Sequence, residues 1–137
     1  MILLRGTISD QGFGLAGKNL PHVVPLIPQR TGLPKLVPGT LNVRLPDPYY
    51  VDAPDAVSTA AEYNGVEVVK LQRCVVSGLR AIIMRPDTHE RIPGFGHGPG
   101  HIELLSAYHL RTALGLADNS HLEVEVEGDD AWWSAAR

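Results

Sequence analysis

The sequence contains one cysteine, Cys74, which excludes an internal disulfide and a zinc site built from cysteines. Its neighbours include Leu71, Val75 and Val76, so we expect a buried structural thiol rather than a nucleophile. The sequence also lacks any apolar run long enough to cross a bilayer. Residues 1–5 are too short for a signal peptide and lack a small-residue cleavage site. We therefore predict a cytoplasmic protein with no membrane partner.

Positive charge is not in excess, because 12 Lys and Arg residues face 15 Asp and Glu residues, a formal net charge of −3. This balance provides no basic surface for nucleic acid, and we expect no nucleic-acid partner. Aromatic residues are few, at 6%, whereas 14 glycines and 11 prolines favour short strands and shaped loops over long helices. A chain of 137 residues fits one domain with a substantial core.

Alternating apolar residues and turn signals predict several short strands. They fall at residues 2–8, 40–45, 66–71, 102–105 and 121–127, and residues 75–84 form one strand or a pair that turns at Ser77-Gly78. Five prolines make residues 20–38 irregular, with at most one short helical turn, and residues 46–61 read as a loop. Residues 107–114 have a helical pattern, with Ser106 as the expected N-cap and Gly115 at the end. Many short strands with one late helix indicate a mainly β protein, a small closed barrel.

The segment from Pro38 to Leu45, PGTLNVRL, places a hydroxyl and a carboxamide two residues apart. Side chains two apart on a strand share a face, so Thr40 and Asn42 would present neutral oxygens side by side. Such oxygens suit Mg²⁺, which takes one or two protein ligands and completes its shell with phosphates and water. The alternative is an ordinary solvated strand face.

A glycine-rich turn follows the first predicted strand, and residues 12–17 match the pattern G-x-G-x-x-G. The dinucleotide-binding form of this pattern must open a helix, whereas prolines follow here, so the Rossmann interpretation fails. Backbone N–H groups of such a turn can still hold phosphates, and Lys18 would add a positive charge. A plain barrel turn is the alternative.

Two further groups of residues raise chemical questions. Six histidines invite a metal hypothesis, but the H-E-x-x-H arrangement is absent and His97 and His101 flank a Gly-Pro-Gly segment, so a zinc site is disfavoured. Glu103 interrupts an apolar strand and lies either on a solvated face or in a pocket, where it could act as a general base. Arg111, on the predicted helix, would reach a nucleotide or lie on the surface.

These segments occur in an order that resembles the archaeal-type CTP-dependent riboflavin kinases. The resemblance rests on the glycine-rich turn, on PGTLNVRL, and on IELL followed by Leu110-Arg111, and it covers roughly residues 3–128. It implies a six-stranded cradle-loop (RIFT-type) β-barrel with one short late helix. It also implies transfer of the terminal phosphate of CTP to the 5′-hydroxyl of riboflavin, which gives FMN and CDP.

The resemblance assigns roles to residues by position. Thr40 and Asn42 would hold Mg²⁺, and Glu103, the catalytic candidate, would contact the flavin together with Phe95. The nucleotide would contact two segments, which comprise Gly12, Phe13, Gly14, Leu15, Ala16, Gly17 and Lys18, and Tyr108, His109, Leu110 and Arg111. We expect residues 1–128 to form the kinase-like barrel and residues 129–137 a C-terminal tail, in a monomer or weak homo-oligomer. The role of Trp132 and Trp133 stays open.

The chain departs from the family pattern in the glycine-rich turn, which is about one residue longer, and in the segment from Phe95 to Gly100, which lacks the usual hydroxyl residue. The second departure motivates an alternative acceptor, a different small alcohol. A non-enzymatic barrel that binds nucleotide, flavin or DNA is the other alternative. The negative charge argues against DNA.

Overall fold

Residues 1–9, 25–37, 40–63, 67–96 and 98–137 are described by this computed structural model. Seven strands are found in this part of the chain, namely β1 (Ile2–Ile8), β2 (Leu41–Arg44), β3 (Ala56–Ser58), β4 (Val69–Val76), β5 (Leu79–Pro86), β6 (His101–Ser106) and β7 (His121–Val126). The helices described are α2 (Leu26–Thr31), α3 (Ala60–Tyr63), α4 (Thr88–Arg91), α5 (Leu110–Ala113) and α6 (Asp130–Ser134). None of these helices is long and apolar enough to cross a membrane.

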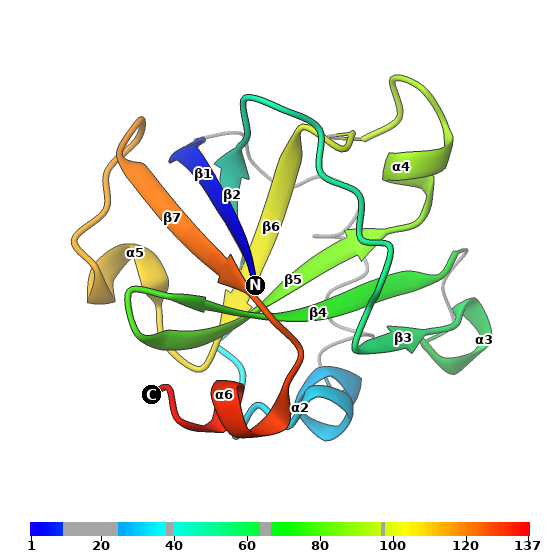
Figure 1. The fold of residues 1–137 in the computed structure, drawn as a ribbon. Coiled ribbons are helices and arrows are strands. Elements are labelled where there is room, and N and C mark those ends of the chain that lie inside the picture. Colours follow the sequence, from blue (N-terminus) through cyan, green and yellow to red (C-terminus); the bar gives the residue numbers. More distant parts are fainter. Residues whose placement is uncertain (10–24, 38–39, 64–66, 97) are drawn as a thin grey trace.

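Six of the strands close into an antiparallel barrel, which confirms the predicted fold (Figure 1). The strand order is β3-β4-β5-β6-β2-β1-β7, and the ring closes where β4 pairs with β7 at Cys74 and Val126. The remaining strand, β3, adds to the free side of β4. Closure pairs the strand edges with one another and leaves the barrel wall with an inner and an outer face.

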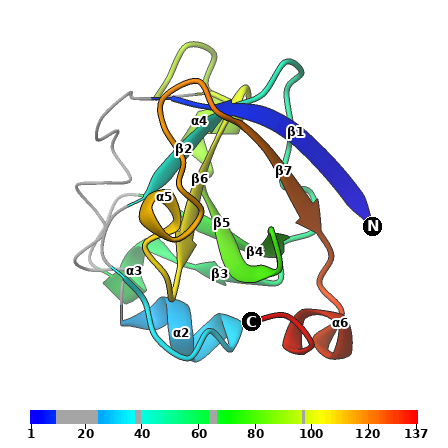
Figure 2. The same cartoon turned by 90° about the vertical axis from the view of Figure 1, so that its left-hand side faces the viewer.

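The two faces of the wall carry separate apolar clusters, because successive side chains of a strand point to opposite sides. Cys74, Ile83 and Leu104 belong to the interior cluster. Leu71 and Ile82 belong to an outer cluster, which α2 and α6 cover from below the barrel (Figures 1 and 2). Helix α6 contributes Trp133, which is 2% exposed and donates from Nε1 to the carbonyl of Cys74 at 3.1 Å. The tryptophan is therefore a packing element of the barrel.

Most predicted strands are confirmed within one to three residues. Residues 75–84 contain the end of β4 and most of β5, joined at Ser77 and Gly78, whose φ angles of 48° and 81° produce a tight hairpin turn. The first strand, Ile2–Ile8, is found as predicted, and the last ends one residue earlier than predicted.

Two local predictions were wrong. The late helix begins at Leu110 with His109 as its N-cap, because Ser106 still pairs with Ala81 in the ladder between β6 and β5. The segment 46–61 was predicted as a loop, yet it contains β3 and the start of α3. Strand β3 has only three residues and depends on pairing with β4, which no local pattern reveals.

Candidate active site

Asn42 and Glu103 form the centre of the candidate site. They lie directly opposite each other on β2 and β6, and they are 8% and 4% exposed. The alternation of both strands sends Leu41, Val43 and Leu104 into the interior cluster, so Asn42 and Glu103 lie on the outer face of the wall. Directly opposite residues have Cβ atoms about 4.5–5.5 Å apart, so a carboxamide and a carboxylate share one small volume.

The burial of Glu103 changes its acidity. Burial raises its pKa from the usual 4.5 to about 7, and the positive charge of Arg85 opposes the increase. A carboxylate that titrates near neutral pH is suited to accept a proton from a substrate hydroxyl. The structure therefore places Glu103 in a buried position, and the solvated-face alternative for this residue is wrong.

The donor chemistry around Asn42 fits a hard cation that is shared with phosphates. Thr40 is half-buried and precedes β2 directly, two residues before Asn42. Within the described part of the chain, no group of three or more His, Cys, Asp or Glu residues could hold a metal ion. Neutral oxygens next to one carboxylate agree with Mg²⁺, which relies on phosphate and water for its other ligands.

The segment Tyr108–Arg111 follows the carboxyl end of β6 (Figure 2). Tyr108 is 36% exposed, and Arg111 forms an ion pair with Asp118 at 2.9 Å. His109 caps α5, with its ring accepting from the backbone N–H of Thr112. Leu110 is 5% exposed in the interior cluster, so only its backbone is available to a ligand.

Phe95 lies before the amino end of β6 and packs on His89, with ring centroids 6.1 Å apart and planes tilted by 59°. His89 is 2% exposed, and the adjacent Gly96 lies so close to its ring that a Cβ atom would overlap it. In the chain, Phe95 precedes β6 and Tyr108 follows it, with Glu103 between them. The glycine-rich turn predicted to contact nucleotide, Gly12–Lys18, lies outside the described residues.

A buried charged network near Phe95 was not predicted from the sequence. Arg85 donates to Glu90 at 2.9 Å and to the carbonyls of Tyr49 and His101 at 2.8 and 2.7 Å. Glu90 also accepts from Lys70 at 2.9 Å and from the backbone of Val51 at 2.8 Å. The bond to the His101 carbonyl ties the amino end of β6 to this network. The sequence signal that could have predicted this network is the presence of charged residues, Lys70 and Arg85, in the mainly apolar strands β4 and β5.

Cys74 is buried as predicted, and burial raises the pKa of its thiol. A neutral, inaccessible thiol cannot act as a nucleophile. The phosphoryl transfer that the resemblance implies needs positioning and charge neutralisation more than covalent chemistry, so a buried Cys74 is compatible with it.

Comparison with known proteins shows which family this chain resembles. A family model for CTP-dependent riboflavin kinases, described as domain of unknown function DUF120, matches residues 34–126. A riboflavin kinase of Methanocella arvoryzae is 36% identical over 93 residues, which are 66% of this chain and 41% of the relative. A riboflavin kinase of Pyrobaculum arsenaticum is 32% identical over 133 residues, 90% of this chain and 60% of the relative.

A third riboflavin kinase, from Methanoculleus marisnigri, is 30% identical over 139 residues, which cover 92% of this chain and 58% of the relative. The chain thus spans 41–60% of the length of these relatives. The region that the family model matches contains β2, β6 and α5 and all of the described candidate residues, from Thr40 to Arg111.

Proposed function

The chain belongs to the family of CTP-dependent riboflavin kinases, and we propose that it transfers the terminal phosphate of CTP to the 5′-hydroxyl of riboflavin. The observation that carries the proposal is the buried pair of Asn42 and Glu103 on adjacent strands. The three relatives, each named a riboflavin kinase, supply the expected acceptor.

The residues before, within and after β6 support a separate position for each substrate. The exposed Tyr108 and the start of α5 lie beyond the carboxyl end of β6, where they bind the nucleotide. Phe95 precedes the amino end, on the side of the flavin. Asn42 and Glu103 lie between the two, where the terminal phosphate of the nucleotide meets the acceptor hydroxyl.

In the proposed reaction, the 5′-oxygen of the ribityl chain forms a bond to the terminal phosphorus, and the bond from that phosphorus to the β-phosphate oxygen breaks. The products are FMN and CDP. Glu103 accepts the proton that the 5′-hydroxyl loses. Thr40 and Asn42 would hold Mg²⁺, which would supply positive charge for the phosphates.

We further propose that residues 1–128 form the kinase barrel and residues 129–137 a C-terminal tail. The packing of Trp133 against the outer cluster supports a structural role for that tail. No residue of α6 is needed for the chemistry proposed above.

The function is tested by incubating the protein with Mg²⁺, riboflavin and each nucleoside triphosphate in turn, and separating FMN from riboflavin by chromatography. We expect FMN with CTP and much less with ATP, GTP or UTP. Failure to form FMN while CTP still binds would overturn the assignment of riboflavin as the acceptor. Equal rates with all four nucleotides would remove the preference for CTP.

A further inference from the structure

Arg44 lies next to the candidate site on the same face of the barrel wall. It follows Asn42 by two residues on β2, a rise of about 6.5–7 Å, so both side chains lie on the outer face of the wall. Its directly opposite neighbours are His101 on β6 and Thr7 on β1. A row of polar residues therefore runs beside the pair of Asn42 and Glu103.

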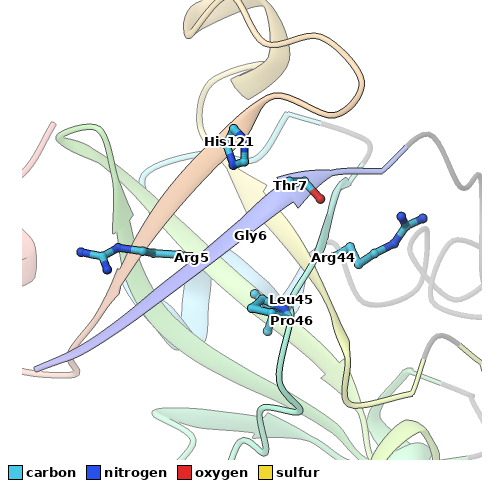
Figure 3. A pocket seen from close by; sticks show the side chains of 7 residues that line it. All are labelled: Arg5, Gly6, Thr7, Arg44, Leu45, Pro46 and His121. Atoms are coloured by element: carbon cyan, nitrogen blue, oxygen red, sulfur yellow. The ribbon is translucent and has the colours of Figure 1, made fainter.

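This row borders a hollow of about 350 Å³ in the surface of the barrel. The hollow is lined by Arg5, Gly6, Thr7, Arg44, Leu45, Pro46 and His121. Figure 3 shows the side chains of Thr7 and Arg44 directed to the same side, whereas Arg5 points the opposite way. One end of the hollow thus combines a hydroxyl with a guanidinium.

The two arginines of the hollow differ in their partners. Arg5 donates to Glu123 at 2.8 Å, so a carboxylate already balances its charge. Among the described residues, no carboxylate lies within ion-pair distance of the exposed Arg44. A guanidinium presents a planar set of N–H donors that matches two oxygens of a phosphate.

We propose that Arg44 and Thr7 form a subsite for the phosphoryl group that passes from nucleotide to acceptor. The inference rests on the proposed function and adds to it a positive charge that the pair of Asn42 and Glu103 lacks. The same phosphoryl group is the terminal phosphate of CTP and the phosphate of FMN, so the subsite can hold it before transfer, after transfer or both. Arg44 is opposite His101 at the amino end of β6, the end that Phe95 precedes in the chain, which favours the phosphate of FMN.

The test compares Arg44→Gln with Arg5→Gln, a matched change in the same hollow. Calorimetric titrations with FMN, riboflavin, CTP and CDP, each with Mg²⁺, separate the two carriers of the phosphate. Charge-assisted bidentate bonds are strong, so we expect Arg44→Gln to weaken FMN binding about tenfold or more and to leave riboflavin binding unchanged. If Arg44→Gln weakens the binding of CTP but not of CDP, the subsite holds the terminal phosphate of the nucleotide instead. Arg5→Gln should change neither the difference in affinity between FMN and riboflavin nor the difference between CTP and CDP.

The proposal is overturned if Arg44→Gln preserves both affinity differences, or if Arg5→Gln reduces them equally. A wild-type protein that binds neither flavin nor nucleotide would refute the proposed function but not decide the subsite. Inorganic phosphate then decides it through the amide resonances of Thr7 and Arg44. Saturable shifts in wild type that vanish in Arg44→Gln support the subsite, and their absence in wild type, or their persistence in the variant, refutes it.

Discussion

Asn42 and Glu103 are directly opposite residues of β2 and β6, and both are more than nine-tenths buried on the outer face of a closed barrel. Buried polar side chains are costly for a fold unless they have partners or a function. Their neighbours on the opposite face of the same strands, Val43 and Ile102, are fully buried and apolar. The polar pair therefore lies on the outer face, and the interior face of the same strands is apolar at these positions.

Replacement of Asn42 by Ala should stop phosphoryl transfer and preserve the fold. The change removes the amide oxygen proposed to hold Mg²⁺, and loss of one charge-stabilising group typically costs about 100-fold or more in turnover. Turnover is measured as FMN formed, and the fold by circular dichroism and a urea titration. A folded variant that makes FMN at the wild-type rate would remove Asn42 from the metal site.

Replacement of Glu103 by Gln should change how stability depends on pH. Burial raises the pKa of Glu103 to about 7, whereas the unfolded chain releases this proton near 4.5. Between these values the folded state binds more protons, so the unfolding free energy of wild type falls as pH rises toward 7. Relative to wild type, the free energy of unfolding of Glu103→Gln should rise by on the order of 1–3 kcal/mol between about pH 5 and about pH 8.

Urea titrations of wild type and Glu103→Gln, each with a metal chelator, measure this gain. The same difference in unfolding free energy between the two proteins at the lower and at the higher pH would contradict it. The same variant should lower turnover or riboflavin affinity, because glutamine cannot accept the proton. Wild-type kinetics in Glu103→Gln would leave the residue with no role in the reaction.

Replacement of Glu90 by Gln should destabilise the protein strongly. Burial raises the pKa of Glu90, but bonds from Val51, Lys70 and Arg85 outweigh it and lower the pKa overall. Removing one member of a buried ion pair leaves the other charge uncompensated, so we expect a loss of about 2–4 kcal/mol in urea titrations. The control is Arg91→Gln in the same helix, which breaks the more exposed pair with Asp87 and should cost less than about 1 kcal/mol.

If both variants lose the same stability, the buried network contributes no more than a surface pair. The low pKa of Glu90 also predicts that its contribution disappears in acid, as pH falls from 4.5 through its folded-state pKa. The stability difference between wild type and Glu90→Gln should therefore shrink in that range.

Replacement of Gly96 by Ala should cost more stability than the same change at Gly98. Both glycines have positive φ angles, 59° and 67°, so each alanine bears a strain of about 1–2 kcal/mol. Only at Gly96 would the new Cβ meet the buried ring of His89, whereas nothing lies within 4 Å at Gly98. The difference between the two thermal midpoints measures this overlap, and equal midpoints would show that the loop shifts without cost.

Local pattern was sufficient for several parts of this protein. Alternating residues predicted the strand Ile2–Ile8 and the buried side chains of Leu122, Val124 and Val126. They also predicted that Thr40 and Asn42 share a strand face, and the structure has Asn42 in β2 and Thr40 directly before that strand. The ordered segments of the whole chain resembled a family, and the family model supports that resemblance.

Tertiary structure decided what depends on contacts between distant segments. The sequence left Glu103 either solvated or buried, and only the structure shows that it is buried. Its position next to Asn42 follows from the pairing of β6 with β2, about sixty residues apart in the chain. The bonds of Glu90 to Lys70 and Val51 likewise join segments that only folding brings together. Sequence determines which face of a strand a side chain occupies. The segments that pack against that face determine whether water reaches the side chain, and therefore how acidic a carboxyl on that face is.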